Sequence, residues 1–195
     1  MKNLFAVLSL LLSFSTVAQI QLDNASFEGE PQDATVPVGW FACAPGTTPD
    51  ILPGFWGVYN DSSEGDTYIG LITRRDGSYE SIGQRLKEPL KKNECYAFAM
   101  DLAHSDSYSG YDGVLNLRIW GGANKCDKDQ LLWQTIEPIE EEDWATFNIN
   151  FTTKQTINYI IIEAFHREEP TPYEGNILLD NITPIKKCPR AFLVK

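Results

Sequence analysis

The sequence is poor in the residues and motifs on which many enzymes depend. It has two histidines, His104 and His166, and no G-x-S-x-G elbow, H-E-x-x-H motif or phosphate-binding loop. These absences exclude the hydrolases, metalloproteases and nucleotide-binding enzymes that carry such motifs. We therefore expect a protein that is not an enzyme. Glycoside hydrolysis by two carboxylates is a less favoured alternative, because sequence does not reveal the distance between them.

Positive charge is also scarce. The chain has 16 lysines and arginines against 27 aspartates and glutamates, which gives a formal net charge of −11 at pH 7. Such a surface repels phosphate backbones and is not attracted to anionic lipid. We therefore do not expect nucleic acid as a partner. Neutral ligands, cations and basic protein surfaces remain as possible partners.

Long apolar runs are absent after residue 20. The one apolar stretch is Leu4–Val17, which follows the positively charged Lys2. Thr16-Val17-Ala18 at its end offers the small residues that a signal peptidase recognises. The stretch is too short to span a membrane, and the pattern is typical of a secretory signal peptide. The residue directly after Ala18 is Gln19 rather than a cysteine, which argues against lipoprotein anchoring. The sequence predicts a signal peptide over residues 1–18 and a single domain over 19–195, secreted to the exterior or the cell surface.

Four cysteines follow this segment, and none has C-x-x-C spacing. An even number in an oxidising compartment predicts two disulfides, for which three connectivities exist. Cys95 opens a predicted strand and Cys188 follows the last one, so antiparallel neighbours would bring these two together. The strand pattern therefore favours Cys95–Cys188, with Cys43 joined to Cys126.

Alternation of apolar and polar residues recurs after residue 20, whereas a helical period is hard to find. The pattern is clear over 96–102, 114–120 and 144–151, and residues 158–165 are more uniformly apolar, as expected of a central strand. Turns rich in Gly, Pro, Asn and Asp separate these segments. The sequence thus predicts an all-β sandwich of two antiparallel sheets.

Several motifs in this order resemble carbohydrate-binding modules of the galactose-binding-like jelly-roll type. They are Asn24–Glu28 with the following Pro37–Trp40, then Gly65–Leu71, Glu80–Leu86 and Asn176–Ile182. The four cysteines and Leu117–Gly122 also resemble amino-terminal domains of secreted surface proteins from gliding, polymer-degrading bacteria. The resemblance implies a jelly-roll sandwich that binds a glycan or polysaccharide without catalysis. The alternative is a structural or adhesive domain of a surface assembly that binds protein.

Two carboxylates form a candidate metal site. Glu28 opens the domain and Asp180 lies in the last apolar strand, which suggests that the first and last strands lie together. Calcium is held by carboxylate and carbonyl oxygens, so the pair could share one ion. The resemblance implies a structural Ca²⁺ rather than a catalytic one. The alternative is two solvated acids at strand ends.

One strand carries a candidate sugar-binding face. Asn116, Arg118 and Trp120 alternate with apolar residues, so all three point to the polar side. An indole stacks on the apolar face of a pyranose, and Arg and Asn donate to its hydroxyls. Asn148 would extend this face if its strand belongs to the same sheet. The alternative is an arginine stacked on the indole over a solvated surface.

Two loops carry a second set of candidate ligand-binding aromatics. Tyr108 and Tyr111 lie in the polar loop 104–112, and Trp56 and Tyr59 lie in an earlier one. Loops at one end of a sandwich commonly bind ligands. The alternative is an ordinary solvated connection. We expect the remaining tryptophans to pack in the interior: Trp40, Trp133 and Trp144.

Overall fold

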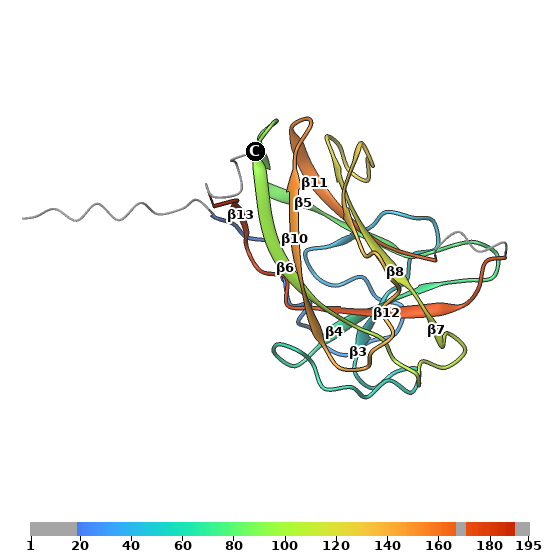
Figure 1. Cartoon of the computed structure of the whole chain (residues 1–195). Helices are drawn as coiled ribbons and strands as arrows, with labels where there is room; N and C mark the ends of the chain where they lie inside the picture. The colour runs from blue at the N-terminus through green and yellow to red at the C-terminus, as the bar shows by residue number, and fades with distance from the viewer. Residues whose placement is uncertain (1–18, 167–170, 190–195) are drawn as a thin grey trace, which may run out of the picture.

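The structure is a computed structural model that describes residues 19–166 and 171–189, so the predicted signal peptide lies outside the described residues. Two sheets face one another across a common core (Figure 1). The eight-stranded sheet contains β1 (Gln19–Ile20), β3 (Asp50–Leu52), β4 (Tyr68–Thr73), β6 (Cys95–Ala103), β7 (Gly113–Val114), β10 (Ala145–Thr152), β12 (Gly175–Asp180) and β13 (Ile185–Lys187). The five-stranded sheet contains β2 (Phe41–Ala42), β5 (Ser81–Leu90), β8 (Asn116–Gly122), β9 (Gln130–Gln134) and β11 (Ile157–Phe165).

The strand order confirms the predicted class. In the eight-stranded sheet the order is β1-β13-β6-β12-β4-β3, with β10 paired to β6 and the short β7 paired to β12. In the five-stranded sheet it is β2-β5-β11-β8-β9. The ladders are antiparallel except for the two-residue pairing of β7 with β12. The first and last described strands pair with each other, since Gln19 lies opposite Lys186. Glu28 lies outside any strand, and Asp180 is the last residue of β12. No described helix is long and apolar enough to cross a membrane.

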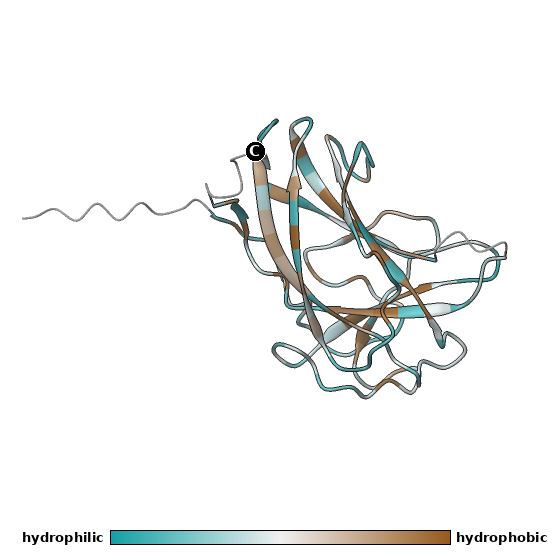
Figure 2. Cartoon of the chain, viewed as in Figure 1, coloured by the Kyte–Doolittle hydropathy of each residue, from teal (hydrophilic) through white to brown (hydrophobic). Residues whose placement is uncertain are grey.

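The alternation seen in the sequence places one face of each strand in the core. Met100 of β6, Ile119 of β8 and Ile162 of β11 are fully buried there. Burying each of these side chains contributes about 1.5–3 kcal/mol relative to exposure. Trp40 also belongs to this core, as predicted, with its ring centroid 5.2 Å from that of Phe27. Hydrophobic positions recur along strands of both sheets (Figure 2), and the core is built from such residues.

Both disulfides have the favoured connectivity. Cys95–Cys188 joins the start of β6 to the residue after β13. Cys43–Cys126 joins the residue after β2 to the loop between β8 and β9, so it links segments that come from opposite sides of the five-stranded sheet. The two bonds close loops with sequence separations of 93 and 83. Chain entropy gives each of them about 3–5 kcal/mol.

Loops cover part of the outer face of the eight-stranded sheet. Tyr68 of β4 and Leu178 of β12 are buried in a second cluster with Val58 and Tyr108 from the loops. Trp144, half-buried as a packing residue, places its ring 5.2 Å from Tyr68. This second cluster fixes the loops that carry the exposed aromatics.

Candidate functional site

The predicted sugar face on β8 is engaged by the protein itself. The guanidinium of Arg118 pairs with the buried carboxylate of Glu163 on β11. Its central carbon lies 5.5 Å from the ring centroid of Trp120 and 4.6 Å from that of Phe165. Lys128 is the second partner of Glu163. Burial lowers the pKa of Arg118 below its usual value. Arg118 thus stacks on the Trp120 indole, which is the arrangement expected if this face does not bind a sugar.

Two residues expected to complete that face do not do so. Asn116 is buried and donates to the Thr135 hydroxyl at 2.8 Å, so no ligand reaches it. Asn148 lies on β10 opposite Ala99 of β6, which places it in the eight-stranded sheet. The condition for extending the face therefore fails. Sequence alternation gives the side to which a residue points, but not the sheet to which its strand belongs.

A disulfide strap, formed by Phe41–Cys43 and Lys125–Cys126, lies over the middle of the same face. A Cβ atom on Gly83 of β5 would lie 2.9 Å from Cys43 Sγ and 2.7 Å from the Phe41 ring. Ile161 of β11 is fully buried, although it points away from the core between Gly83 and Trp120. The strap therefore occupies the surface on which a long ligand would lie.

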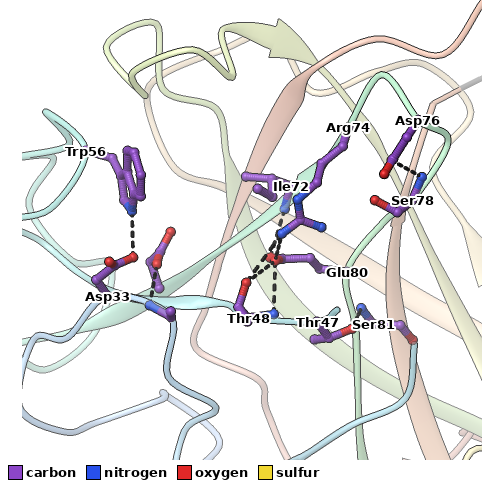
Figure 3. A network of polar contacts seen from close by, with 12 residues as sticks. Asp33, Thr47, Thr48, Trp56, Ile72, Arg74, Asp76, Ser78, Glu80 and Ser81 are labelled. Atoms are coloured by element: carbon purple, nitrogen blue, oxygen red, sulfur yellow. Dashed lines mark hydrogen bonds and ion pairs between the residues drawn. The ribbon is translucent and has the colours of Figure 1, made fainter. Parts of the chain in front are cut away.

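Two of the four loop aromatics are far more accessible. Trp56 is 43% exposed and Tyr59 is 73% exposed. The indole Nε1 of Trp56 donates to Asp33 Oδ1 at 2.9 Å (Figure 3). Its ring stands edge-on to Tyr111, with an interplanar angle of 90° and centroids 6.4 Å apart. We call Trp56, Tyr59 and Tyr111 the aromatic platform.

Backbone contacts fix the platform in place. Trp56 has a φ of +54°, which is uncommon for a residue with a side chain, and its carbonyl accepts from the Ser109 amide at 2.8 Å. The carbonyl of Gly57 accepts from the Ser107 hydroxyl at 2.9 Å. A Cβ atom on Gly57 would lie 2.8 Å from the Ser107 carbonyl oxygen. The two loops are therefore cross-linked by hydrogen bonds at the exposed tryptophan.

Tyr108, which we expected to bind ligand, instead supports the platform from below. It is buried, its ring centroid lies 6.1 Å from that of Tyr111, and its hydroxyl donates to Asp50 Oδ2. Burial raises the pKa of Asp50 to about 6, although the hydrogen bonds from Tyr108 and from the Ala34 amide act in the opposite direction. Burial also raises the pKa of Tyr108. A tyrosine that fills a core position offers no surface to a ligand.

Glu80 is a second buried carboxylate whose oxygens accept hydrogen bonds from fixed partners. Glu80 pairs with Arg74 at 2.7 Å (Figure 3). It also accepts from the amides of Thr48 at 3.0 Å and Ile72 at 3.2 Å. Burial raises the pKa of Glu80, although the contacts with Thr48, Arg74 and Ile72 each act to lower it. Its hydrogen-bond partners make it a structural anchor for the segment before β3.

The two candidate metal ligands hold one loop. Asp180 is buried, and its Oδ2 accepts from the amides of Ser63 and Glu64 at 2.9 Å each. Glu28 accepts from the amide of Asp66, at 3.2 Å to Oε1 and 3.1 Å to Oε2. Burial raises the pKa of Asp180 to about 6, and the charge of Glu28 adds to this effect.

These amides supply partial positive charge to the carboxylates, as a cation would. The described residues contain no group of three or more His, Cys, Asp or Glu side chains that could hold a metal ion. Each carboxylate oxygen has two lone pairs, so an amide bond does not use up its capacity as a ligand. Calcium needs six or more oxygens, so carbonyls would have to complete the set. Calcium binding by Glu28 and Asp180 stays a prediction.

Comparison with known proteins identifies the architecture. No family model and no curated protein matches the sequence. Among solved structures, the K3 cleaved adhesin domain of Lys-gingipain from Porphyromonas gingivalis W83 aligns with a TM-score of 0.55 at 12% identity, over 87% of this chain and 99% of that one. The CBM22-1 xylan-binding domain of Paenibacillus barcinonensis Xyn10C aligns with a TM-score of 0.54 at 15% identity, over 90% and 97% of the two chains. A CBM4 structure gives a TM-score of 0.50 at 16% identity, over 86% and 100%.

The fold is a jelly roll of the carbohydrate-binding-module type. This confirms the resemblance seen in the sequence motifs. At these identities the likeness shows the fold alone, and one such fold carries many functions. The function and the ligand therefore have to be argued from the residues of this chain.

Sequence reasoning missed two features that decide between the candidate surfaces. It predicted the Cys43–Cys126 bond, but not that this bond crosses the outer face of the five-stranded sheet. It also missed Asp33, whose contact with Trp56 spans 23 residues of irregular chain. The available signal was local, since Trp56 stands between Gly54 and Gly57 in a segment without strand alternation. Such glycines often accompany an unusual backbone conformation.

Proposed function

We propose that this protein is a secreted, non-catalytic glycan-binding domain whose ligand stacks on the aromatic platform. One observation carries the proposal. Trp56 is exposed at a fixed position, with its Nε1 bonded to Asp33 and its backbone bonded to Ser109. Residues other than glycine that have a positive φ, as Trp56 has, persist where the surrounding structure holds them, and they cluster at functional sites. The fold and the two disulfides support the same proposal.

The platform has the chemistry that a sugar requires. A pyranose presents a flat apolar face to an indole or phenol ring, and its hydroxyls need polar partners at the edges. Ser109 and Asp112 are exposed on the same loop as Tyr111. Because the rings of Trp56 and Tyr111 are already fixed, their binding to a ligand loses little conformational entropy. We expect dissociation constants in the micromolar-to-millimolar range for short oligosaccharides, or about 4–8 kcal/mol.

Two buried carboxylates, Asp50 and Glu80, do not form a hydrolytic pair. Asp50 and Glu80 are both buried, and both accept hydrogen bonds from fixed partners. Glycoside hydrolysis requires two carboxyl groups that flank the scissile bond in an accessible cleft. These two are not accessible, so they do not form such a pair.

The test is a glycan array followed by affinity electrophoresis on the polysaccharides that bind. Trp56→Ala should abolish retardation and leave the melting temperature within a few degrees, since an exposed ring contributes little to stability. Trp120→Ala is the matched control, which should retain binding because that ring is stacked on Arg118. If Trp120→Ala lost binding and Trp56→Ala kept it, the glycan site would lie on the face of β8 instead. The absence of binding to any glycan would contradict the proposed function itself.

A further inference from the structure

One side of the sandwich is left open by two edge strands. In the described residues β9 pairs only with β8, and β10 pairs only with β6. Two adjoining grooves of about 390 and 370 Å³ open along this side. They share the segment Glu137–Ile139 and the side chain of Phe147. We call the two together the edge groove.

The floor of the edge groove is apolar. Trp133 of β9 and Phe147 of β10 meet edge-on with ring centroids 6.1 Å apart, so the two rings bridge the two sheets. Ile136 at the rim is 80% exposed. Single exposed apolar residues are common on proteins, but here the exposed isoleucine continues a strip of partly buried rings. The strip offers apolar area that a partner would cover.

The rim of the edge groove is acidic. Glu137, Glu140, Glu141 and Asp143 line it, whereas none of its described lining residues is a lysine or an arginine. Charges of one sign around an apolar floor favour a partner that brings the opposite charge. The occupant should therefore combine apolar side chains with lysine or arginine.

Strand β10 adds a backbone template to this surface. Ala145–Thr152 contains neither a charged residue nor a proline, which are the residues that usually protect an edge from pairing. Its side chains alternate between polar and apolar along the strand (Figure 2). The Gln130 side chain binds the Thr152 carbonyl and the Lys154 amide, which covers one end. Among the described residues, none hydrogen-bonds to the outward backbone groups of the part of the strand beside the groove.

A sugar suits this groove poorly. The hydroxyl of Thr135 already accepts from the Asn116 side chain at 2.8 Å and from the Leu117 amide at 3.1 Å. Sugar hydroxyls placed on an apolar floor would lose their bonds to water without replacement, and that loss is costly. The apolar floor, the acidic rim and the uncovered strand edge together match a peptide instead.

We propose that the edge groove binds an extended peptide segment of a partner protein, which adds as a strand along β10. Apolar side chains of the peptide cover Trp133, Phe147 and Ile136, and its lysines or arginines face the acidic rim. The backbone supplies the affinity, and alternate side chains supply the specificity. This site is separate from the aromatic platform and does not depend on glycan binding.

The probe is a fluorescent ten-residue peptide of alternating valine and threonine with a lysine at each end. A second peptide has glutamates in place of the lysines, and a third is methylated on the backbone nitrogens of one edge. Fluorescence anisotropy measures affinity, and hydrogen exchange locates the protected amides. We expect the lysine peptide to bind at least tenfold more tightly than either of the others and to slow exchange along β10.

Variants of the protein test the same surface. Ile136→Ser should weaken binding of the lysine peptide about tenfold, because a buried apolar contact is lost. Val38→Ser is the matched control, since Val38 is 81% exposed outside the groove, and it should leave affinity unchanged. The double change Glu140→Lys with Asp143→Lys should reverse the preference toward the glutamate peptide.

Several outcomes would overturn the proposal. They are equal binding of the three peptides, no binding of any of them, an unchanged affinity in Ile136→Ser, or protection confined to other strands. Dodecanoate that protects the β10 amides while no peptide does so would assign the groove to an acyl chain instead. A glycan-binding protein with none of the expected peptide effects would leave the proposed function intact and remove this inference alone.

Discussion

The face of β8 and the aromatic platform each present a tryptophan beside charged residues, yet they differ in what they can offer a ligand. On β8, Arg118 stacks on Trp120 and pairs with Glu163, so cation, ring and carboxylate satisfy one another. On the platform, Trp56 donates its Nε1–H to Asp33 and meets Tyr111 edge-on, and much of its ring stays exposed. A sheet face satisfied from within contributes to stability. A fixed ring with an uncovered surface is suited to recognition.

The largest expected effect comes from removing the buried carboxylate of Glu163 on β11, which tests whether the face of β8 contributes to stability. Glu163→Gln leaves Arg118 and Lys128 without their shared partner. Loss of one member of a buried ion group is strongly destabilising, although both cations here are partly exposed. We expect a loss of about 2–4 kcal/mol in unfolding free energy by urea titration.

The control for this change is Glu94→Gln, which removes an exposed pair with Lys187 and should have no measurable effect. Unchanged stability in Glu163→Gln would mean that the arginine is effectively solvated. The face of β8 would then regain its place as a ligand site.

The comparison also predicts that the platform depends on one close approach of two loops. Gly57 has a φ of +83°, and an added Cβ would meet the Ser107 carbonyl oxygen. We expect Gly57→Ala to cost about 1–2 kcal/mol of stability and to weaken glycan binding about tenfold, because Trp56 loses its fixed position.

Gly46→Ala controls for backbone strain alone. Gly46 has a φ of +76°, but an added Cβ meets nothing within 4 Å. This variant should lose some stability and keep its affinity for glycan. Equal losses of affinity in both variants would show that the cross-linked loops do not position the tryptophan.

Patterns within single strands predicted more of this molecule than contacts between distant segments. The alternation around Met100 and Ile119 gave the sandwich and its core correctly, because burial on one face imposes a period of two. The prediction that Asn116 contacts a ligand was wrong, because its side chain bonds to Thr135, a residue just after the neighbouring strand β9 that the pattern within β8 does not reveal. Tyr108 failed because a loop residue can enter the second cluster on the outer face of a sheet. Such burial depends on how loops fold over strands, which no local pattern encodes.

The loop held by Glu28 and Asp180 offers a test on the platform side of the molecule. Calcium that binds only the folded state should raise the unfolding free energy by about 1.4 kcal/mol at ten times its dissociation constant. Melting curves in chelator and in millimolar calcium measure this. Asp180→Asn should lose the response, and the exposed neighbour change Glu64→Gln should keep it. A curve that does not move with calcium would leave the amides of residues 63–66 as the partners of both carboxylates.

The smallest expected effect concerns proton binding under the platform. The pKa of Asp50 is about 6 in the folded protein against 3.8 for a free carboxyl, because burial disfavours its charge. The folded state therefore holds a proton more tightly than the unfolded state, and stability falls as pH rises through this window. From pH 5 to pH 7 we expect a loss of about 1 kcal/mol from this group. Asp50→Asn should flatten that part of the profile.

Urea titrations of both proteins at pH 5 and pH 7 measure the difference directly. Glu80 and Asp180 also have raised pKa values, so both proteins should keep a residual decline from those groups. The quantity to compare is thus the difference in slope between wild type and variant. Parallel profiles would show that Asp50 is already neutral or already solvated at both pH values. The Tyr108–Asp50 contact would then support the platform without any penalty that depends on pH.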